Sequence, residues 1–292
     1  MKLNIEEVFI ECVDRWATAQ WDDRIDTAMD NFDTWIESFD EYEKKVLCNL
    51  LKKFNYYTHN NVIDILRKLS DEAKETYKIS NKDSIISVIR KKDGKLGSSS
   101  AYIIDHKMIS GLSKDIYYDS LNGIREEEWK NIKNVVFVDD CSGTGKTFVD
   151  FLKMQKQIFS DKRIILIVVE IMEEAYKYIK NYATQKGINI EIVAHYVKEK
   201  AFKEDKFSER EIFIKMSEKQ QIRSNYISGY KETEALMAFY NNTPNNTLGL
   251  FWFPTEKNIP IFPRELDERP GWKQISFDKQ KRTKQQYEVK IE

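Results

Sequence analysis

Two adjacent carboxylates and a run of small residues stand directly after a strongly apolar segment near the middle of the chain. The apolar segment is residues 135–138, the acids are Asp139 and Asp140, and the small, hydroxyl-rich run covers residues 142–147. Four consecutive apolar residues are typical of a strand buried in a parallel sheet. An apolar-periodic helix is expected to begin near Thr147, so the acids and the small residues form a junction between strand and helix.

This order of strand, loop and helix favours the binding of an anion next to a polyol. The first N–H groups of a helix lack intrahelical partners and lie at the positive end of its dipole. Ser142, Thr144 and Thr147 add hydroxyl donors, and the carboxylates of Asp139 and Asp140 suit vicinal diols or a metal ion. The sequence therefore predicts a sugar phosphate as ligand, with its phosphate on the loop and its hydroxyls on the acids.

The same segment has two other interpretations. A nucleotide-triphosphatase P-loop requires Gly, any four residues and then Gly-Lys-Thr, which places its first glycine at Asp140. A carboxylate there would face the phosphates that the loop must hold. A purely structural junction would leave consecutive acids at a buried strand end, which is costly without a function.

The segment resembles the phosphoribosyl pyrophosphate (PRPP) loop of type I phosphoribosyltransferases at every fixed position. That pattern is four apolar residues, Asp-Asp, any three residues, Thr-Gly, any one residue and Thr. The resemblance implies that Asp139 and Asp140 hold the ribose 2- and 3-hydroxyls, and that Mg²⁺ reaches them through substrate or water. It also implies that the segment from residue 141 wraps the 5-phosphate. The expected substrate-binding residues there are Ser142, Gly143, Thr144, Gly145, Lys146 and Thr147.

One position departs from the purine-salvage members of that superfamily. In the hypoxanthine-guanine enzymes, an Asp directly precedes the Thr-Gly-Lys-Thr sequence and acts on the purine N7. Here that position is Gly143. An ordinary purine-salvage role is therefore not expected.

Composition narrows the classes of function. The chain has 292 residues, with 47 basic and 48 acidic side chains and a formal net charge of -1, which argues against a broad nucleic-acid-binding surface. No apolar run approaches the ~20 residues that span a bilayer, and the N-terminus lacks the order of a signal peptide. The three widely spaced cysteines fit a reducing cytoplasm. We expect a cytoplasmic protein without a membrane partner.

The apolar periodicity changes along the chain and divides it. Apolar residues recur at three- and four-residue steps over residues 5–16, 35–39, 46–54 and 62–69. This periodicity predicts an all-helical N-terminal region, residues 1–80. From residue 84, the expected strands are 84–89, 135–138, 163–169, 188–193 and 234–240, and the expected helices include 173–185 and 207–221. This alternation predicts an α/β domain over residues 81–277 with a mostly parallel, twisted sheet of phosphoribosyltransferase type. Residues 278–292 form a charged C-terminal tail.

A second strand, loop and helix start precedes the acidic loop. Residues 90–100 contain four basic residues and three serines at the expected start of a helix. Early loops in type I phosphoribosyltransferases bind the pyrophosphate of PRPP, so the resemblance implies that task here. The residues expected to perform it are Lys95, Ser98, Ser99 and Ser100. The alternative is a solvated basic turn with a serine-rich helix cap.

An asparagine-rich turn covers residues 241–247 and follows an expected strand, so it should reach the edge where Asp139 lies. Asn245 and Asn246 can both donate and accept hydrogen bonds, which suits reading a base or polarising an acceptor. Trp252 or Phe253 could stack on a ring. An ordinary turn over an apolar cap remains an equal alternative.

Four features follow one another over most of residues 5–275. In order, they are the helical N-terminal region, the Gly-Ser-Ser-Ser loop, the acidic loop and the asparagine-rich turn. This arrangement resembles the phosphoribosyltransferase-like proteins of bacterial conflict systems, some of which are effectors of anti-phage defence loci, including retrons. The resemblance implies a cytoplasmic toxin held silent by protein partners and released by infection. A reverse transcriptase with its nucleic acid is one such partner, and self-association stays open.

Two classes of function follow. The first is an enzyme that binds PRPP or a nucleotide with Mg²⁺ and transfers or hydrolyses the phosphoribosyl group. The second is a non-catalytic sensor or assembly module that keeps the sugar-phosphate site. A P-loop NTPase is the third and weakest alternative.

Overall fold

The computed structural model describes residues 4–90, 99–155, 159–202 and 207–264. Its centre is a five-stranded sheet in the order β3-β2-β4-β5-β6, in which every pair of neighbours is parallel. The strands are β2 (Ser84–Ser87), β3 (Tyr117–Tyr118), β4 (Asn134–Ser142), β5 (Arg163–Met172) and β6 (Asn189–Lys198). The predicted α/β class with a mostly parallel sheet is confirmed.

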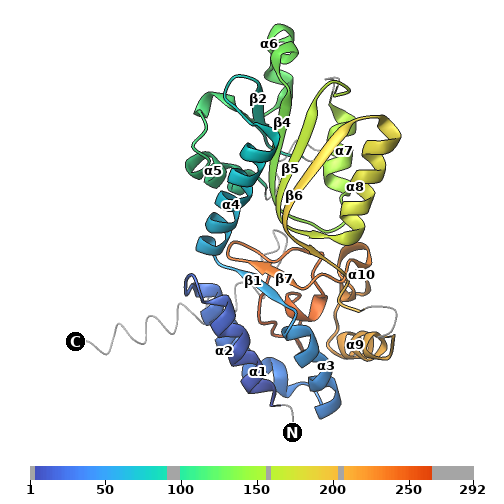
Figure 1. Ribbon diagram of the computed structural model, residues 1–292. Coiled ribbons are helices and arrows are strands. Elements are labelled where there is room, and N and C mark those ends of the chain that lie inside the picture. Colours follow the sequence, from blue (N-terminus) through green and yellow to red (C-terminus); the bar gives the residue numbers. More distant parts are fainter. Residues whose placement is uncertain (1–3, 91–98, 156–158, 203–206, 265–292) are drawn as a thin grey trace, which may run out of the picture.

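Helices cover both faces of this sheet (Figure 1). Helices α4 (His59–Tyr77) and α5 (Ser99–Ile109) lie on one side, and α7 (Lys146–Met154) and α8 (Glu173–Lys186) lie on the other. A short helix, α6 (Glu126–Asn131), leads into β4. The apolar residues of β4 and β5 are buried from both sides, which explains why their sequences are continuous rather than alternating apolar runs.

Strand β4 is longer than the sequence predicts. Its pairing with β5 includes Cys141 opposite Glu170 and Ser142 opposite Ile171. Strand β5 runs on to Met172 and supplies backbone partners along this length. The loop expected from residue 141 is therefore shorter, and only residues 143–145 separate β4 from α7.

A second hydrophobic core lies beyond the carboxyl ends of the main strands. Helices α1 (Ile5–Trp16), α2 (Asp23–Glu37) and α3 (Glu41–Leu51) share it with α9 (Phe207–Lys219), α10 (Ser224–Ile227) and the segment up to Phe262. Its centre is aromatic: Phe54 and Phe262 stack with their ring centroids 5.3 Å apart. The two ends of the described chain therefore build one core, which we call the second core. The domain boundaries expected at residues 80/81 and 277/278 stay a prediction.

The late strand predicted over residues 234–240 does not join the main sheet. The structure has β7 (Met237–Phe239), which pairs in parallel with β1 (Asn55–Tyr57) in a separate two-stranded sheet. The N-terminal region is thus not entirely helical, because β1 lies within it. Thr58 ends β1 and caps α4, its hydroxyl accepting a hydrogen bond from Asn61 N at 3.3 Å.

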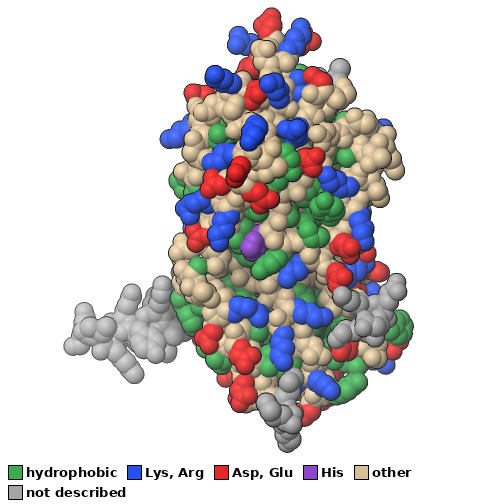
Figure 2. Space-filling model, in the orientation of Figure 1, with side chains coloured by type: hydrophobic (Ala, Val, Ile, Leu, Met, Phe, Trp, Pro, Cys, Tyr) green, Lys and Arg blue, Asp and Glu red, His purple; other side chains and the backbone are tan. Residues whose placement is uncertain are grey.

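The surface agrees with the balanced composition. Figure 2 shows acidic and basic side chains interspersed over the face in view rather than gathered by sign. Among the described residues, no helix combines the length and the apolar content that crossing a membrane requires.

Candidate functional site

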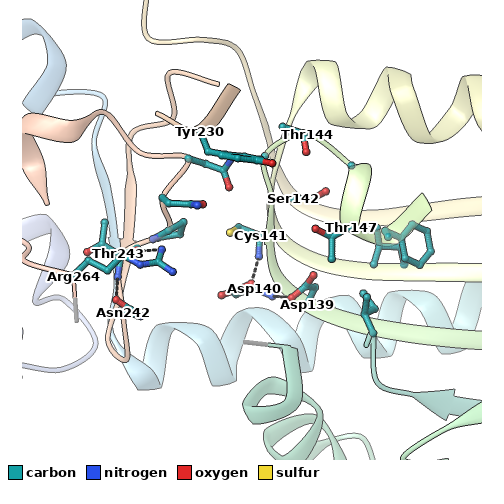
Figure 3. Close-up of a pocket in the computed structure, with 18 residues that line it drawn as sticks. Asp139, Asp140, Cys141, Ser142, Thr144, Thr147, Tyr230, Asn242, Thr243 and Arg264 are labelled. Carbon is teal, nitrogen blue, oxygen red and sulfur yellow. Dashed lines mark hydrogen bonds between the residues drawn. The ribbon is translucent and has the colours of Figure 1, made fainter. Parts of the chain in front are cut away.

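A cavity of about 440 Å³ lies where the carboxyl end of β4 meets the asparagine-rich turn (Figure 3). This volume is within the range of about 300–1,000 Å³ that small-molecule sites occupy. The cavity is lined by Ile89, Asp139, Asp140, Cys141, Ser142, Gly143, Thr144, Gly145, Thr147, Phe148, Leu166, Tyr230, Asn242, Thr243, Pro244, Asn245, Asn246 and Arg264. The cavity is therefore formed by the main sheet together with segments next to the second core.

Asp139 and Asp140 are the acidic wall of this cavity. They stand on the last part of β4, and Asp140 N donates to Asp139 Oδ1 at 3.0 Å while Cys141 N donates to Asp140 Oδ1 at 2.7 Å. Burial, followed by the neighbouring charge of Asp140, raises the pKa of Asp139 well above its ordinary value. A buried pair of this kind gains from a ligand that brings hydroxyl donors or a cation.

The turn between β4 and α7 forms a second wall. Gly145 has a φ of 69°, in the left-handed region, and a β-carbon there would lie 2.9 Å from the carbonyl oxygen of Ala175 on α8. Glycine thus allows α7 to begin directly behind the acids. The first N–H group of α7, that of Lys146, donates to Thr144 Oγ1 at 3.3 Å, and Gly145 at the N-cap position supplies no side chain. The helix start therefore presents N–H groups at the turn, beside the hydroxyls of Thr144 and Thr147 that line the cavity.

Lys146 was expected to bind the ligand, but its side chain does not line the cavity. Its Nζ lies 2.6 Å from Asp150 Oδ2, one helical turn further along α7. Lys146 is the first residue of α7, and residues four apart on a helix lie on the same face, so its side chain can reach Asp150. We therefore assign the side chain of Lys146 to this ion pair.

The pyrophosphate loop expected upstream is only partly within the described residues. Lys95 and Ser98 lie outside them, and Ser99 and Ser100 are the first residues of α5. Ile89, just after β2, lines the cavity, so the chain reaches the site immediately before this loop. The role of the four residues stays a prediction.

The asparagine-rich turn reaches the cavity, as its place after a strand suggested. Asn245 and Asn246 line the cavity together with the acids. The aromatic residues beyond the turn do not serve the site: Trp252 is fully buried in the second core and donates from Nε1 to Thr247 O at 2.7 Å. The expectation that Trp252 or Phe253 stacks on a ligand ring is wrong, because both side chains are buried in that core.

Asn246 also explains why position 143 carries no side chain. A β-carbon on Gly143 would collide with the carboxamide of Asn246. The absence of an acid at this position therefore follows from packing between the turn after β4 and the asparagine-rich turn. An aspartate could stand here only if Asn246 moved.

Four further polar residues line the cavity that were not predicted from the sequence. Tyr230 stands at the cavity with its backbone N–H donating to Asn245 O at 2.7 Å. Arg264 donates from Nη1 to Thr243 O at 2.8 Å, and Figure 3 shows it beside Thr243 and Asn242, on the side away from Thr147. Neither Tyr230 nor Arg264 lies in a recognisable motif, so only long-range packing could place them. Asn242 and Thr243 belong to the turn whose later residues were named.

The parallel sheet, the acidic pair at the end of β4 and the glycine turn behind it define a phosphoribosyltransferase-like α/β protein. The family model PRTase-CE matches residues 32–264, and the chain belongs to that family. No curated protein matches the chain.

Among the solved structures that match, two each align with half of this chain. One is a hypothetical protein from Neisseria gonorrhoeae with bound ppGpp, 14% identical, covering 50% of this chain and 85% of its own, with a TM-score of 0.32. The other is the xanthine-guanine-hypoxanthine phosphoribosyltransferase of Helicobacter pylori, 10% identical, covering 50% of this chain and 89% of its own, also with a TM-score of 0.32.

Proposed function

We propose that this protein binds PRPP, or a nucleotide with the same ribose 5-phosphate group, and transfers or hydrolyses the phosphoribosyl group. One observation carries this proposal: the acidic pair on β4 and the turn at residues 143–147 line a single cavity. Their chemistries are opposite, since one wall accepts hydrogen bonds and the other donates them. A pentose 5-phosphate has hydroxyls at one end and an anion at the other, which matches both walls.

Each wall has a defined task in this proposal. The N–H groups at the start of α7 and the hydroxyls of Thr144 and Thr147 hold the 5-phosphate, while Asp139 and Asp140 accept hydrogen bonds from the ribose hydroxyls. The carboxylates also place negative charge near the anomeric carbon, which becomes positive as the leaving group departs. Positioning and electrostatics then carry most of the rate enhancement.

The acidic wall suits Mg²⁺ held jointly with the ligand. Two adjacent carboxylates are hard oxygen ligands, and a bound cation would offset the burial and the repulsion from Asp140 that raise the pKa of Asp139. Among the described residues, no group of three or more His, Cys, Asp or Glu side chains could hold a metal alone. Substrate oxygens or water would complete its coordination, and the ion would neutralise a departing pyrophosphate.

In the transfer reaction, PRPP reacts with a nucleophile that carries a proton. The products are the phosphoribosylated nucleophile, pyrophosphate and a proton, so the reaction balances. Water as the nucleophile gives ribose 5-phosphate. The residues expected to hold the pyrophosphate are those of the loop that ends at Ser100. An NTPase function fits less well, because the lysine that should contact phosphates is paired with Asp150.

We also propose that this activity serves as a toxin in bacterial anti-phage defence, controlled by protein partners of a defence complex, among them a reverse transcriptase with its nucleic acid. The motif order described above supports this part of the proposal. The balanced charge is compatible with a cytoplasmic protein that docks through limited surfaces.

Binding and turnover of PRPP test the proposal directly. Calorimetric titration with PRPP and Mg²⁺ should show one site, and replacing both Asp139 and Asp140 by Asn should weaken binding by about 100-fold or more, since two charge-assisted contacts are lost. Asp64→Asn, which alters an exposed carboxylate on α4, is the matched control and should leave affinity unchanged. Binding that survives the double substitution would refute the assigned site. Tight binding without pyrophosphate release would favour the sensor.

A further inference from the structure

The carboxamide of Asn246 lies directly over Gly143, between the turn after β4 and the second core. A β-carbon on Gly143 would collide with this carboxamide, so the two groups are in close contact. Asn246 also lines the cavity that holds the acidic pair. The orientation of its amide therefore decides whether this part of the site offers a donor or an acceptor.

The hydroxyl of Thr233 determines that orientation. Thr233 is 2% exposed, and its Oγ1 lies 2.8 Å from Tyr230 O and 3.0 Å from Asn246 O. Both partners are carbonyl oxygens, so the single hydroxyl proton is directed to them. The side chain of Asn246, whose Nδ2 is 3.1 Å from Thr233 Oγ1, must then donate. The amide nitrogen therefore faces Thr233, with Oδ1 at the other end of the carboxamide.

Hydrogen bonds hold the backbone on both sides of this pair in place. Asn246 O also accepts from Ala235 N at 3.1 Å, and Tyr230 N donates to Asn245 O at 2.7 Å. Lys231, Glu232 and Glu234 have φ values of 54°, 55° and 49°, in the left-handed region, which is strained for residues other than glycine. Such a segment persists only when its surroundings determine it fully, and such strain is concentrated at functional sites.

We propose that Asn246 Oδ1 is a fixed hydrogen-bond acceptor that orients the second reactant. The site then takes a nucleophile that presents an O–H or N–H group to this oxygen: water, a hydroxyl or an amine. An unprotonated ring nitrogen would face a carbonyl oxygen there and leave both groups unpaired, which is unfavourable. This inference rests on the proposed function and specifies the chemical class of its acceptor.

The step balances without a further co-reactant. The bond between the anomeric carbon and the pyrophosphate oxygen breaks, and its electron pair leaves with pyrophosphate. The nucleophile forms its bond to the same carbon and loses its proton to pyrophosphate or solvent. A neutral amide does not take up this proton, so Asn246 orients the reactant and does not act as a base.

Pyrophosphate release from PRPP with Mg²⁺, in water alone and with ammonia supplied by an ammonium salt in alkaline buffer, tests this inference. Asn246→Leu should lower kcat by about tenfold or more in both conditions, which is the loss of one good hydrogen bond to the transition state. Its KM for PRPP should stay within about twofold, because the ribose and phosphate contacts are elsewhere. Asn246→Asp keeps an acceptor oxygen and should restore most of the lost rate.

Thr233→Val supplies a second variant that leaves Asn246 in place. Loss of the hydroxyl frees the amide to turn, so kcat should fall by about threefold to tenfold at unchanged KM. Thr184→Val is the matched control, since Thr184 is exposed and its hydroxyl bonds only to Lys180 O of its own helix, at 3.1 Å. Thermal denaturation of each variant separates this effect from loss of folded protein.

The outcomes separate the inference from the proposed function. Wild-type kcat in Asn246→Leu, or a raised KM with unchanged kcat, would overturn the inference and leave PRPP binding intact. PRPP binding without pyrophosphate release, in water alone or with ammonia, would overturn the inference together with the catalytic part of the proposed function, because both nucleophiles present the required proton. Failure of PRPP to bind at all would refute the proposed function, and the inference with it.

Discussion

The hydroxyl of Tyr57 on β1 donates to Glu170 Oε2 on β5 at 2.5 Å. Asn55 Nδ2 donates to the same oxygen at 2.7 Å, so two residues of the small sheet contact one carboxyl of the main sheet. Glu170 is 1% exposed and stands opposite Cys141 in the register of β4 and β5. Strand β1 pairs with β7, which leads into the asparagine-rich turn. This contact therefore helps to position the asparagine-rich turn relative to the acidic wall on β4.

Replacing Glu170 should therefore affect both stability and ligand binding. Glu170→Leu leaves the buried hydroxyl of Tyr57 without its acceptor and should lower the free energy of unfolding by about 1–3 kcal/mol. PRPP affinity should also fall, because the turn loses one of its anchors. Urea denaturation and calorimetry measure the two effects. Glu170→Gln keeps an acceptor and should lose less of each, and equal losses in both variants would contradict this role.

The burial of His106 predicts a dependence of stability on pH. Its ring nitrogens lie 2.9 Å from Tyr117 Oη and 3.1 Å from Ser70 Oγ, and burial, followed by the charge of Lys74, lowers its pKa from 6.5 to about 4. Because the pKa is lowered on folding, His106 binds a proton more readily in the unfolded chain, so protonation favours unfolding. The contribution of the neutral ring is complete above pH 6.5 and is lost as pH falls toward 4, by about 3 kcal/mol in total.

Urea denaturation between pH 7.5 and 4 measures this loss. Carboxyl groups titrate over part of the same range, so the comparison is with His106→Gln, which cannot gain a proton. The variant should be less stable at neutral pH and should show a shallower decline toward acid. Parallel curves for the two proteins would contradict the assignment.

Two glycines in the left-handed region allow steric and conformational costs to be separated. Gly145 and Gly187 have φ values of 69° and 63°, but a β-carbon at Gly187 meets nothing within 4 Å, whereas one at Gly145 meets Ala175 O and Ile179 Cγ1, both at 2.9 Å. Gly187→Ala should cost about 1–2 kcal/mol of stability. Gly145→Ala should cost more and weaken PRPP binding, because α7 must shift. Equal costs by thermal denaturation would show that the contacts of Gly145 with α8 do not matter.

The acidic pair predicts that ligand binding strengthens as pH rises. The pKa of Asp139 is raised well above its ordinary value by burial and by Asp140, so a proton competes with Mg²⁺ or with ribose hydroxyls at low pH. Calorimetry at several pH values should show the affinity for PRPP with Mg²⁺ increasing with pH until the pair is ionised. Asp139→Asn should flatten this dependence. Affinity that falls with rising pH would contradict a metal-assisted role.

Much of the fold follows from local sequence pattern. The apolar runs that became β4 and β5 are buried on both faces, and the stripes over residues 5–16 and 62–69 became α1 and α4. The acids and the glycine turn after β4 were also found from sequence, because a parallel strand followed by a short turn must place them at the carboxyl edge of the sheet.

The remainder depended on contacts between distant segments. Three features were decided by which surfaces meet in the folded protein. They are the pairing of β7 with β1 rather than with the main sheet, the burial of Trp252, and the ion pair of Lys146 with Asp150. A three-residue strand carries too little pattern to specify its partner, and an indole is equally suited to a core or a ligand.

The sequence by itself determined the chemistry of the acidic wall and of the turn behind it, since Asp139, Asp140 and that turn are adjacent in the chain. Only the tertiary structure decided the opposite wall, where Tyr230, Asn246 and Arg264 come from segments without a shared motif. The physical reason is that spacing along the chain fixes local geometry, whereas packing of the second core against the sheet sets the distance between the walls.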